Sequence, residues 1–292
     1  MIKIGILGTD NSHSITFASH FNLKESKQRI PGGKIVAIYG LEEARNLEVA
    51  QKGQVPVIVK RPEDLIGLVD AAIVDFRHGS RHLQYAKPMI QAGIPTFIDK
   101  PFAASVADAR AMVALARKHR VPITSFSTVR FGTGLEAFKK EVAQIGRVKA
   151  LVVTGPGNAR DPHDGIFFYA VHQVELMLEL FGTDVTWARG VEQDGTLVGS
   201  VQYRTGMLAT IHQTGTAAFH SFAAVAFGDK GQARYDSASS PDMSLIATKV
   251  ILRMFRTGVR PLDDDAITAS TRVLAAIQES ARRGGAAVKI AR

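Results

Sequence analysis

The first 126 residues alternate between short apolar runs and helix-like segments, and this alternation constrains the fold more than any other feature. Runs with the composition of buried β-strands lie at 2–7, 34–39, 55–59, 71–76, 95–99 and 121–126. Segments with helical spacing or helix-end signals lie between them, at 13–21, 41–52, 81–92 and 106–119. Such alternation favours a parallel sheet covered by helices on both faces. The sequence therefore predicts a doubly wound α/β domain over residues 1–125.

From about residue 126 the pattern changes to one helix-rich stretch followed by consecutive strands. Helices are predicted at 135–144, 167–181, 241–257 and 263–283, and strands at 147–154, 185–192, 196–203, 207–214, 221–227 and 232–237. Short turns such as Asp194-Gly195 join these strands, and strands joined by tight turns pair antiparallel. We therefore expect residues 126–292 to form an α+β domain with a large, mainly antiparallel sheet.

Composition narrows the class of protein. Hydrophobic residues make up 46% of the chain and charged residues 22%, as in soluble globular proteins. There is no apolar run of membrane-spanning length, and the strand pattern that begins at Ile2 does not fit a signal peptide. A cytoplasmic location is therefore expected. The absence of cysteine excludes disulfides, thiolate zinc sites and cysteine nucleophiles.

The net charge of +9 raises the question of an anionic partner. The basic residues are scattered, with no long basic run and no interleaved aromatic residues, so a nucleic-acid partner is not expected. One stripe has helical spacing: Lys249, Arg253, Arg256 and Arg260. A solvated helix face is the favoured interpretation, and recruitment of an anionic ligand or partner is the alternative.

The stretch GILGTDNSHS, residues 5–14, follows the first predicted strand. A dinucleotide-binding loop at this point reads G-x-G-x-x-G, but Asp10 and His13 replace the second and third glycines. The backbone N–H groups of a helix N-terminus still favour an anion there, whereas the Asp10 carboxylate opposes one. Asp10 could instead cap the helix or bind a ribose, and His13 could offset its charge. Taken alone, the stretch fits a plain strand–turn–helix better than a nucleotide site.

Two other strand ends carry informative residues. An NAD site usually has an acidic residue after the second strand, which binds the ribose 2′-hydroxyl, but Gly40 occupies that position. Glu42 could substitute, and Arg45 either favours a 2′-phosphate or is a surface helix residue. Lys100, after the fifth strand, either extends along a helix face or handles protons and orients substrate. Pro101 could follow a cis peptide bond.

His172 lies on an otherwise apolar helix. Tyr169 and Glu175 are three residues away on either side, so they share its face. This trio supports an acid–base role, although a lone histidine on such a helix is more often a satisfied core residue.

Two histidine-containing stretches raise the question of a metal site, but neither favours one, so no metal is expected. His78 and His82 are four residues apart, but Gly79 and Ser80 indicate that a helix begins between them. His163 and Asp164 lie in a loop flanked by glycine and proline.

Taken in order, the motifs resemble the glucose–fructose oxidoreductase / inositol dehydrogenase (Gfo/Idh/MocA) family over essentially the whole chain. They read IKIGILG, VDAAIVDFRHGSRH, PTFIDKPFAASVADARAMVALARKH, FSTVRFG, VHQVELMLELFG and FGDKGQARYDS. The segment DKP looks like the family's Glu-Lys-Pro motif, with Asp99 in place of glutamate. The resemblance implies a Rossmann domain, a mainly antiparallel substrate domain, NAD or NADP as cofactor, and a sugar, polyol or related carbonyl substrate.

The resemblance also implies roles for individual residues. Lys100 matches the lysine that orients substrate and assists proton transfer, and His172 matches the usual acid–base residue, with Tyr169 as a third catalytic candidate. Candidate substrate-binding residues are Lys100, Arg130, His163 and His172. Ligands of open parallel sheets bind outside the carboxyl ends of the strands. Candidate cofactor-binding residues there are Gly8, Thr9, Asp10, Asn11, Ser12, His13, Gly40, Arg45, Phe76, Arg77, His78, His82, Asp99 and Lys100.

The chain departs from the family pattern at four points: Asp10, His13, Gly40, and Phe168 where an aspartate usually precedes the histidine by four residues. These departures indicate an outlying subfamily. The predicted function is an NAD(P)-dependent oxidoreductase of CH–OH groups, and a homodimer or homotetramer is expected because family members pair through the open sheet. The alternatives are a non-enzymatic ligand or nucleotide sensor and an NAD-assisted glycosidase or epimerase.

Overall fold

The computed structural model describes residues 1–216, 218 and 220–291, which form two compact units. The first unit comprises Met1–Ala103, Ala107–Phe126 and Leu245–Asp264. The second comprises Ala104–Val106, Ser127–Ser244 and Asp265–Arg292. The second unit thus includes the short segment Ala104–Val106, and the chain returns to the first unit over Leu245–Asp264.

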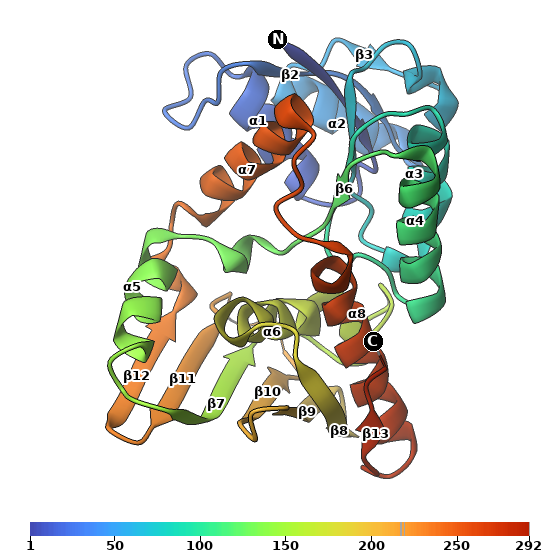
Figure 1. The fold of residues 1–292 in the computed structure, drawn as a ribbon. Coiled ribbons are helices and arrows are strands. Elements are labelled where there is room, and N and C mark those ends of the chain that lie inside the picture. Colours follow the sequence, from blue (N-terminus) through green and yellow to red (C-terminus); the bar gives the residue numbers. More distant parts are fainter. Residues whose placement is uncertain (217, 219, 292) are drawn as a thin grey trace. The chain divides into compact units, whose positions relative to one another are not determined.

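The first unit contains a six-stranded parallel sheet in the order β3-β2-β1-β4-β5-β6 (Figure 1). The strands are β1 (Ile2–Leu7), β2 (Gly33–Tyr39), β3 (Val57–Ile58), β4 (Ala71–Val74), β5 (Thr96–Ile98) and β6 (Ile123–Thr124). The connecting helices are α1 (His13–Asn22), α2 (Glu43–Gly53), α3 (His82–Gln91) and α4 (Val106–His119). The predicted doubly wound domain is confirmed. The order reverses between β1 and β4, which is where ligands bind in such sheets.

Helix α7 (Met243–Thr257) packs against this first unit rather than the second. Its Thr248 hydroxyl lies 2.9 Å from Nδ1 of His20 on α1, and Arg256 donates a hydrogen bond to the carbonyl of Pro31. The predicted second domain, 126–292, had included this helix. Its sequence predicts an amphipathic helix but does not show which sheet the apolar face covers.

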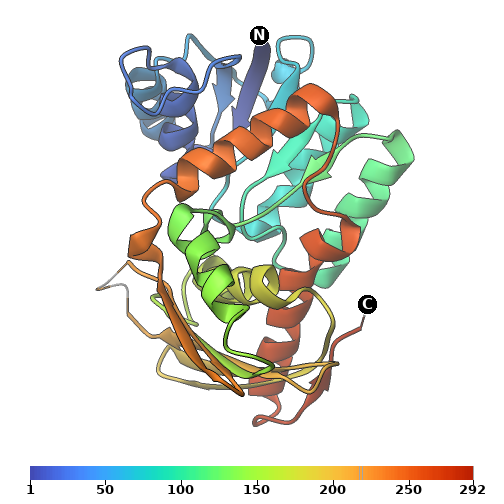
Figure 2. The same ribbon diagram turned by 60° about the vertical axis from the view of Figure 1, so that its left-hand side comes forward.

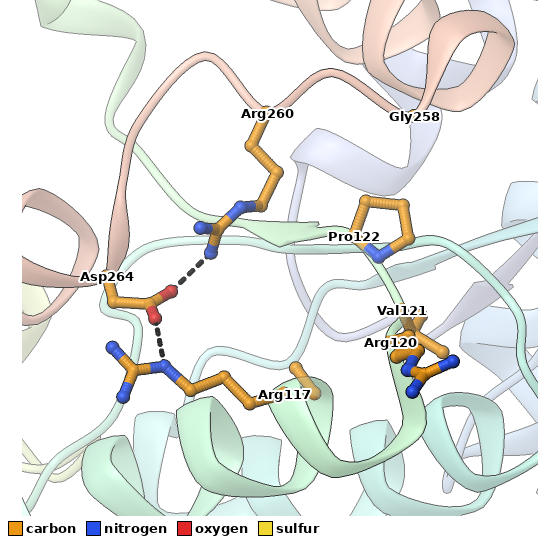
Figure 3. A pocket seen from close by; sticks show the side chains of 8 residues that line it. Arg117, Arg120, Val121, Pro122, Gly258, Arg260 and Asp264 are labelled. Atoms are coloured by element: carbon orange, nitrogen blue, oxygen red, sulfur yellow. Dashed lines mark hydrogen bonds and ion pairs between the residues drawn. The ribbon is translucent and has the colours of Figure 1, made fainter.

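Three residues of the basic stripe are exposed to solvent, and the fourth, Arg260, belongs to a cluster of ion pairs. Lys249, Arg253 and Arg256 are exposed on α7. Arg260 lies beyond the helix, and the Asp264 carboxylate sits between it and Arg117 (Figure 3). The side chains of Arg117, Arg260 and Asp264 line a shallow depression of about 550 Å³.

The second unit contains a seven-stranded sheet in the order β12-β11-β7-β10-β9-β8-β13 (Figure 2). Its strands are β7 (Val148–Gly155), β8 (Val185–Gln193), β9 (Thr196–Tyr203), β10 (Leu208–Thr214), β11 (Ala223–Gly228), β12 (Gly231–Asp236) and β13 (Val288–Lys289). The β7–β10 pair is parallel and the remaining described pairs are antiparallel. The expected mainly antiparallel sheet is therefore confirmed, with β13 as an unpredicted edge strand.

Helices cover one face of this second sheet and leave the other face open. The helices are α5 (Thr133–Val142), α6 (Ile166–Phe181) and α8 (Asp264–Arg282). Helix α8 approaches closely because Gly190 has no side chain: a Cβ there would lie 2.5 Å from the Ile277 carbonyl. On the open face, Val191, Val198, Leu208 and Phe227 are at least 40% exposed.

Among the described residues, no helix has the length and apolar character needed to cross a lipid bilayer. The cytoplasmic location remains a prediction.

Candidate functional site

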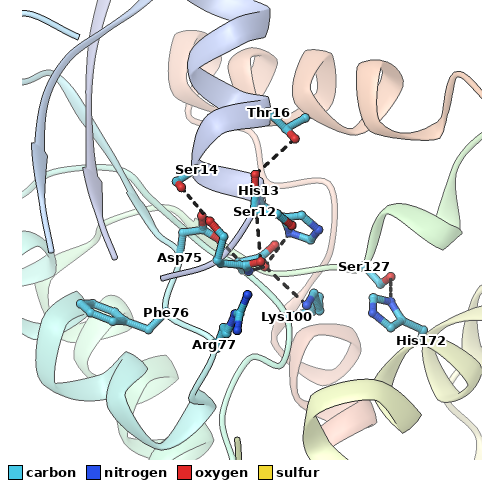
Figure 4. Close-up of polar contacts among 12 residues, drawn as sticks. Ser12, His13, Ser14, Thr16, Asp75, Phe76, Arg77, Lys100, Ser127 and His172 are labelled. Carbon is cyan, nitrogen blue, oxygen red and sulfur yellow. Dashed lines mark hydrogen bonds and ion pairs between the residues drawn. The ribbon is translucent and has the colours of Figure 1, made fainter. Parts of the chain in front are cut away.

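The carboxyl ends of β1, β4 and β5 bring the candidate residues of the first unit together. These strands are neighbours, and Leu7, Val74 and Ile98 are aligned across them. The residues that follow each strand therefore emerge side by side, as Figure 4 shows for His13, Asp75 and Lys100. The Lys100–Pro101 peptide bond is cis, in agreement with the sequence prediction.

Gly8 allows the first loop to pass directly over the end of β4. Its φ is +108°, and a Cβ at this position would lie 2.6 Å from the backbone of both Asp75 and Phe76. Both the backbone conformation and the close approach exclude larger residues. The first glycine of the motif thus has a structural role that does not depend on a nucleotide.

We expect Gly8→Ala to lower the free energy of unfolding by roughly 3 kcal/mol or more, because backbone strain and a steric clash both act on it. Urea denaturation of the two proteins measures this difference. Gly93→Ala is the matched control. Gly93 also has a positive φ, +78°, but its Cβ would meet no atom within 4 Å. The control variant should therefore lose only the free energy of unfolding that backbone strain costs, about 1 kcal/mol. Equal losses in the two variants would contradict the close-approach argument.

Asn11 bridges two buried carboxylates at the centre of this region. Its amide Nδ2 donates hydrogen bonds to Oδ1 of Asp75 (2.9 Å) and Oδ2 of Asp99 (3.1 Å). Nδ1 of His13 lies 2.9 Å from the same Asp99 oxygen, and Nζ of Lys100 lies 4.0 Å from it. Asn11 and His13, the latter in place of a phosphate-loop glycine, therefore form a network with the DKP segment.

The pKa values of the Asp75 and Asp99 carboxyl groups are shifted in opposite directions. Burial raises the pKa of Asp75 well above its usual value, and the neighbouring Asp99 raises it further. Burial also acts upward on Asp99, but His13, Lys100 and His82 together outweigh it and hold its pKa at about 2. In the ligand-free chain at neutral pH, Asp99 therefore carries the negative charge and Asp75 is the more readily protonated partner.

Asp10 does not cap helix α1. Its Oδ2 accepts a hydrogen bond from the backbone N–H of Arg77 (3.3 Å), while Oδ1 is buried without a hydrogen-bond partner among the described residues. The N-cap residue is Ser12, whose side chain makes no capping hydrogen bond. Oδ1 of Asn11 accepts a hydrogen bond from the backbone N–H of His13 at 3.5 Å, so the first turn of α1 has one side-chain partner.

A side-chain hydrogen bond between Thr9 and Asn46 lies next to Gly40, at the end of β2. The Thr9 hydroxyl donates to Oδ1 of Asn46 at 2.7 Å, and a Cβ on Gly40 would lie 2.0 Å from that hydroxyl oxygen. Arg45 donates from Nε to the carbonyl of Thr9 (3.1 Å) and pairs with Glu48. The packing at this strand end therefore requires a glycine at position 40. The hydrogen bond from Arg45 stabilises the loop that contains Thr9.

The segment after β4 is held by aromatic and backbone contacts. Phe76 is buried and stacks on Tyr85, with ring centroids 4.3 Å apart. Nε2 of His82 contacts the Phe76 carbonyl at 2.8 Å, and burial lowers the His82 pKa. Helix α3 begins at His82 after a short 3₁₀ turn from Gly79, so the helix start predicted between His78 and His82 is observed.

In the second unit, His172 is buried on α6 and pairs with a residue that the sequence reasoning missed. Its Nδ1 lies 2.6 Å from the hydroxyl of Ser127, which also accepts a hydrogen bond from the Val129 N–H (3.3 Å). The Tyr169 ring is 5.8 Å from the imidazole, centroid to centroid. Ser127 thus takes the place at Nδ1 that an aspartate would take in a His–Asp pair. Its only sequence signal was its position beside the domain boundary.

Arg130 is enclosed by acidic groups of α6. It pairs with Glu175 and, at 2.9 Å, with Glu179, which also binds Lys139. Glu175, which shares a helix with His172, therefore forms an ion pair with Arg130. One guanidinium nitrogen, Nη2, is buried without a hydrogen-bond partner in the described part of the chain.

His163 contacts Asp161, with Nδ1 2.8 Å from Oδ1, and its ring lies 4.8 Å from that of Phe168. The Asp161 carboxylate therefore contacts this imidazole.

Residues 2–126 match one protein family model, the Gfo/Idh/MocA oxidoreductase family with an NAD-binding Rossmann fold. The match covers the six-stranded sheet and ends where the chain enters the second unit. The Rossmann domain of this chain is therefore similar to that of the Gfo/Idh/MocA family. The resemblance inferred from the motifs is confirmed.

The curated relatives of this chain are distant. An uncharacterised oxidoreductase of Escherichia coli is 28% identical over 123 residues, which cover 38% of this chain and 35% of that protein. An inositol 2-dehydrogenase of Paracoccus denitrificans is 27% identical over 199 residues, 64% of this chain and 56% of the relative. The chain therefore matches only about a third to somewhat over half of these relatives' own lengths.

Solved structures share the fold over the whole chain. The scyllo-inositol dehydrogenase of Lactobacillus casei, solved with bound NAD(H) and scyllo-inositol, has a TM-score of 0.83 at 15% identity, with 100% of both chains covered. This likeness shows a common fold.

Proposed function

We propose that the protein is an NAD(P)-dependent oxidoreductase that transfers hydride to or from a sugar, polyol or related small hydroxy or carbonyl compound. The observation that carries this proposal is the placement of the Gly8 loop beside the Asp99–Lys100 segment at the switch point of a family-matched Rossmann sheet. Relatives named as dehydrogenases, including an inositol 2-dehydrogenase, support the substrate class.

The residues present fit a dinucleotide. The Ser12 side chain makes no capping hydrogen bond and Asn11 binds the His13 N–H, so the next backbone N–H groups of the first turn can bind phosphate oxygens. The unpartnered, buried Oδ1 of Asp10 can accept a hydrogen bond from a ribose hydroxyl. The bound cofactor would supply the hydride acceptor or donor. Around it, Thr9, Asn11, Ser12 and Phe76 would form the walls of the site.

Proton handling is assigned to Lys100 and His172. The Lys100 ammonium would donate a hydrogen bond to the substrate oxygen and so favour its alkoxide form. His172 would exchange the hydroxyl proton through Nε2, because its Nδ1 is bound to Ser127. Tyr169, beside His172, would orient the substrate. Arg130 has two glutamate partners, so its proposed contact with substrate would use the Nη2 group that has none.

Calorimetric titration with NAD, NADH, NADP and NADPH tests this function. We expect at least one to bind, and the comparison decides between NAD and NADP. Failure of all four to bind at millimolar concentrations would overturn the proposal and favour a sensor of another ligand. Binding with no net change in cofactor redox state across a sugar and polyol panel would favour an NAD-assisted glycosidase or epimerase.

We also propose that the open face of the second sheet pairs with a further copy of the chain. The exposed side chains Val191, Val198, Leu208 and Phe227 lie on β8, β9, β10 and β11, and their strand register places them on this one face. An apolar sheet face of this kind is usually covered in a soluble protein.

A further inference from the structure

The structure brings together a potential metal-binding group that the sequence did not suggest. His13, Asp75 and Asp99 each offer one nitrogen or oxygen ligand atom, and these atoms all lie within 4.8 Å of one another. The three residues follow three different strands, β1, β4 and β5, so their proximity depends on the sheet order. A cluster of this kind is compact enough to share one ion.

A second observation points to a missing partner at this cluster. Asp75 has no solvent-exposed surface, and its Oδ2 has no hydrogen-bond donor within the described residues, where the neighbouring side chain is the Asp99 carboxyl. Its Oδ1 is already bound by Asn11. An unsatisfied carboxylate oxygen in a protein interior is costly, and native structures normally give such an atom a hydrogen-bond donor or a cation.

The local charge also favours a cation. The charged groups that act on Asp75 are the carboxylates of Asp99 and Asp10 and the ammonium of Lys100. With Asp75 itself ionised, three carboxylates and one ammonium leave two negative charges, which one divalent ion balances.

We propose that His13, Asp75 and Asp99 bind a first-row divalent metal ion, of which Mn²⁺ is a suitable probe. One imidazole nitrogen and two carboxylate oxygens suit Mn²⁺, Fe²⁺ or Zn²⁺ better than Mg²⁺, which rarely takes nitrogen ligands. Three protein ligands leave coordination positions open. If the proposed function holds, phosphate oxygens of the cofactor can occupy these positions, and the ion then offsets the carboxylates of Asp10, Asp75 and Asp99.

The test is a titration of chelator-treated protein with Mn²⁺ in the absence of nucleotide. Electron paramagnetic resonance measures the concentration of free ion, and calorimetry measures the heat of binding. We expect one ion to bind per chain. His13→Gln and Asp75→Asn should each weaken binding by about 10–100-fold or more. Asp161→Asn is the matched control, because Asp161 forms a similar 2.8 Å pair with His163 but lies outside the three-residue cluster. Circular dichroism and thermal melting establish that each variant is folded.

Two results would overturn the metal site: no binding of Mn²⁺ or Zn²⁺ by the wild-type protein, or equal binding by folded wild-type, His13→Gln and Asp75→Asn proteins. Since no nucleotide is present, this outcome is separate from that of the cofactor titration. A chain that binds cofactor with unchanged affinity in chelator, and binds no metal, would retain the proposed function and lose this inference.

Discussion

Replacing Lys100 with methionine should lower kcat by roughly 10²–10⁴-fold, the range typical of general acid–base groups. Methionine keeps the length and apolar stem of the side chain but removes the ammonium. Lys100 is 6% exposed and its neighbour Asp99 retains His13 as an ionic partner, so we expect the fold to survive. Cofactor affinity should change little, because the proposed role concerns the substrate oxygen. Steady-state kinetics and cofactor calorimetry measure the two effects separately.

The control for this prediction is Lys87→Met, which removes an exposed lysine of α3 in the same unit. Its kcat should equal that of the wild-type protein. A Lys100→Met protein with unchanged kcat would refute the assignment of Lys100, whereas loss of cofactor binding along with activity would give Lys100 a role in the cofactor site.

The fold was largely predictable because its signals are local. Fully buried parallel strands such as β4 give continuous apolar runs, and helix ends are marked by glycine and capping residues. The assignment of α7 to the first unit was not predictable, because amphipathicity reveals an apolar face without revealing its partner. Strand β13 has only two residues and depends on pairing with β8 for its conformation.

The positions of the candidate site were predictable, but the pairings within it were not. Sheet topology alone places residues 8–13, 75–78 and 99–100 at one edge. That Asn11 would turn to Asp75 and Asp99, 64 and 88 residues away, depends on tertiary geometry. Asp75 was missed as a site residue because it follows an apolar run that indicates only a buried strand.

Gly40 shows why a missing motif residue can be misread. In the sequence it looked like the loss of a ribose-binding acid. In the structure a side chain at this position would collide with the bonded pair Thr9 and Asn46. The glycine is therefore a packing requirement of this loop, and any ribose contact must come from another residue.

Replacing His172 with glutamine should lower kcat by about 10²–10⁴-fold and remove one limb of the pH–rate profile. Glutamine retains polar atoms near the Ser127 hydroxyl but cannot exchange a proton. Ser127→Ala should have a smaller effect, roughly tenfold, because it leaves the imidazole in place and removes one hydrogen bond that orients it. Initial rates across pH for the three proteins measure both the size of the loss and the shape of the profile.

Ser127→Asp distinguishes an acid–base His172 from one that only packs. A carboxylate beside Nδ1 favours the protonated imidazole, so the limb of the profile that reports His172 should move to higher pH by about one unit or more. A histidine with a purely structural role would lower the rate by a constant factor at every pH when its neighbour changes. Identical profile shapes for the wild-type, Ser127→Ala and Ser127→Asp proteins, all folded by circular dichroism, would therefore remove His172 from the proposed proton transfer. Lys100 would then be the remaining candidate for that role.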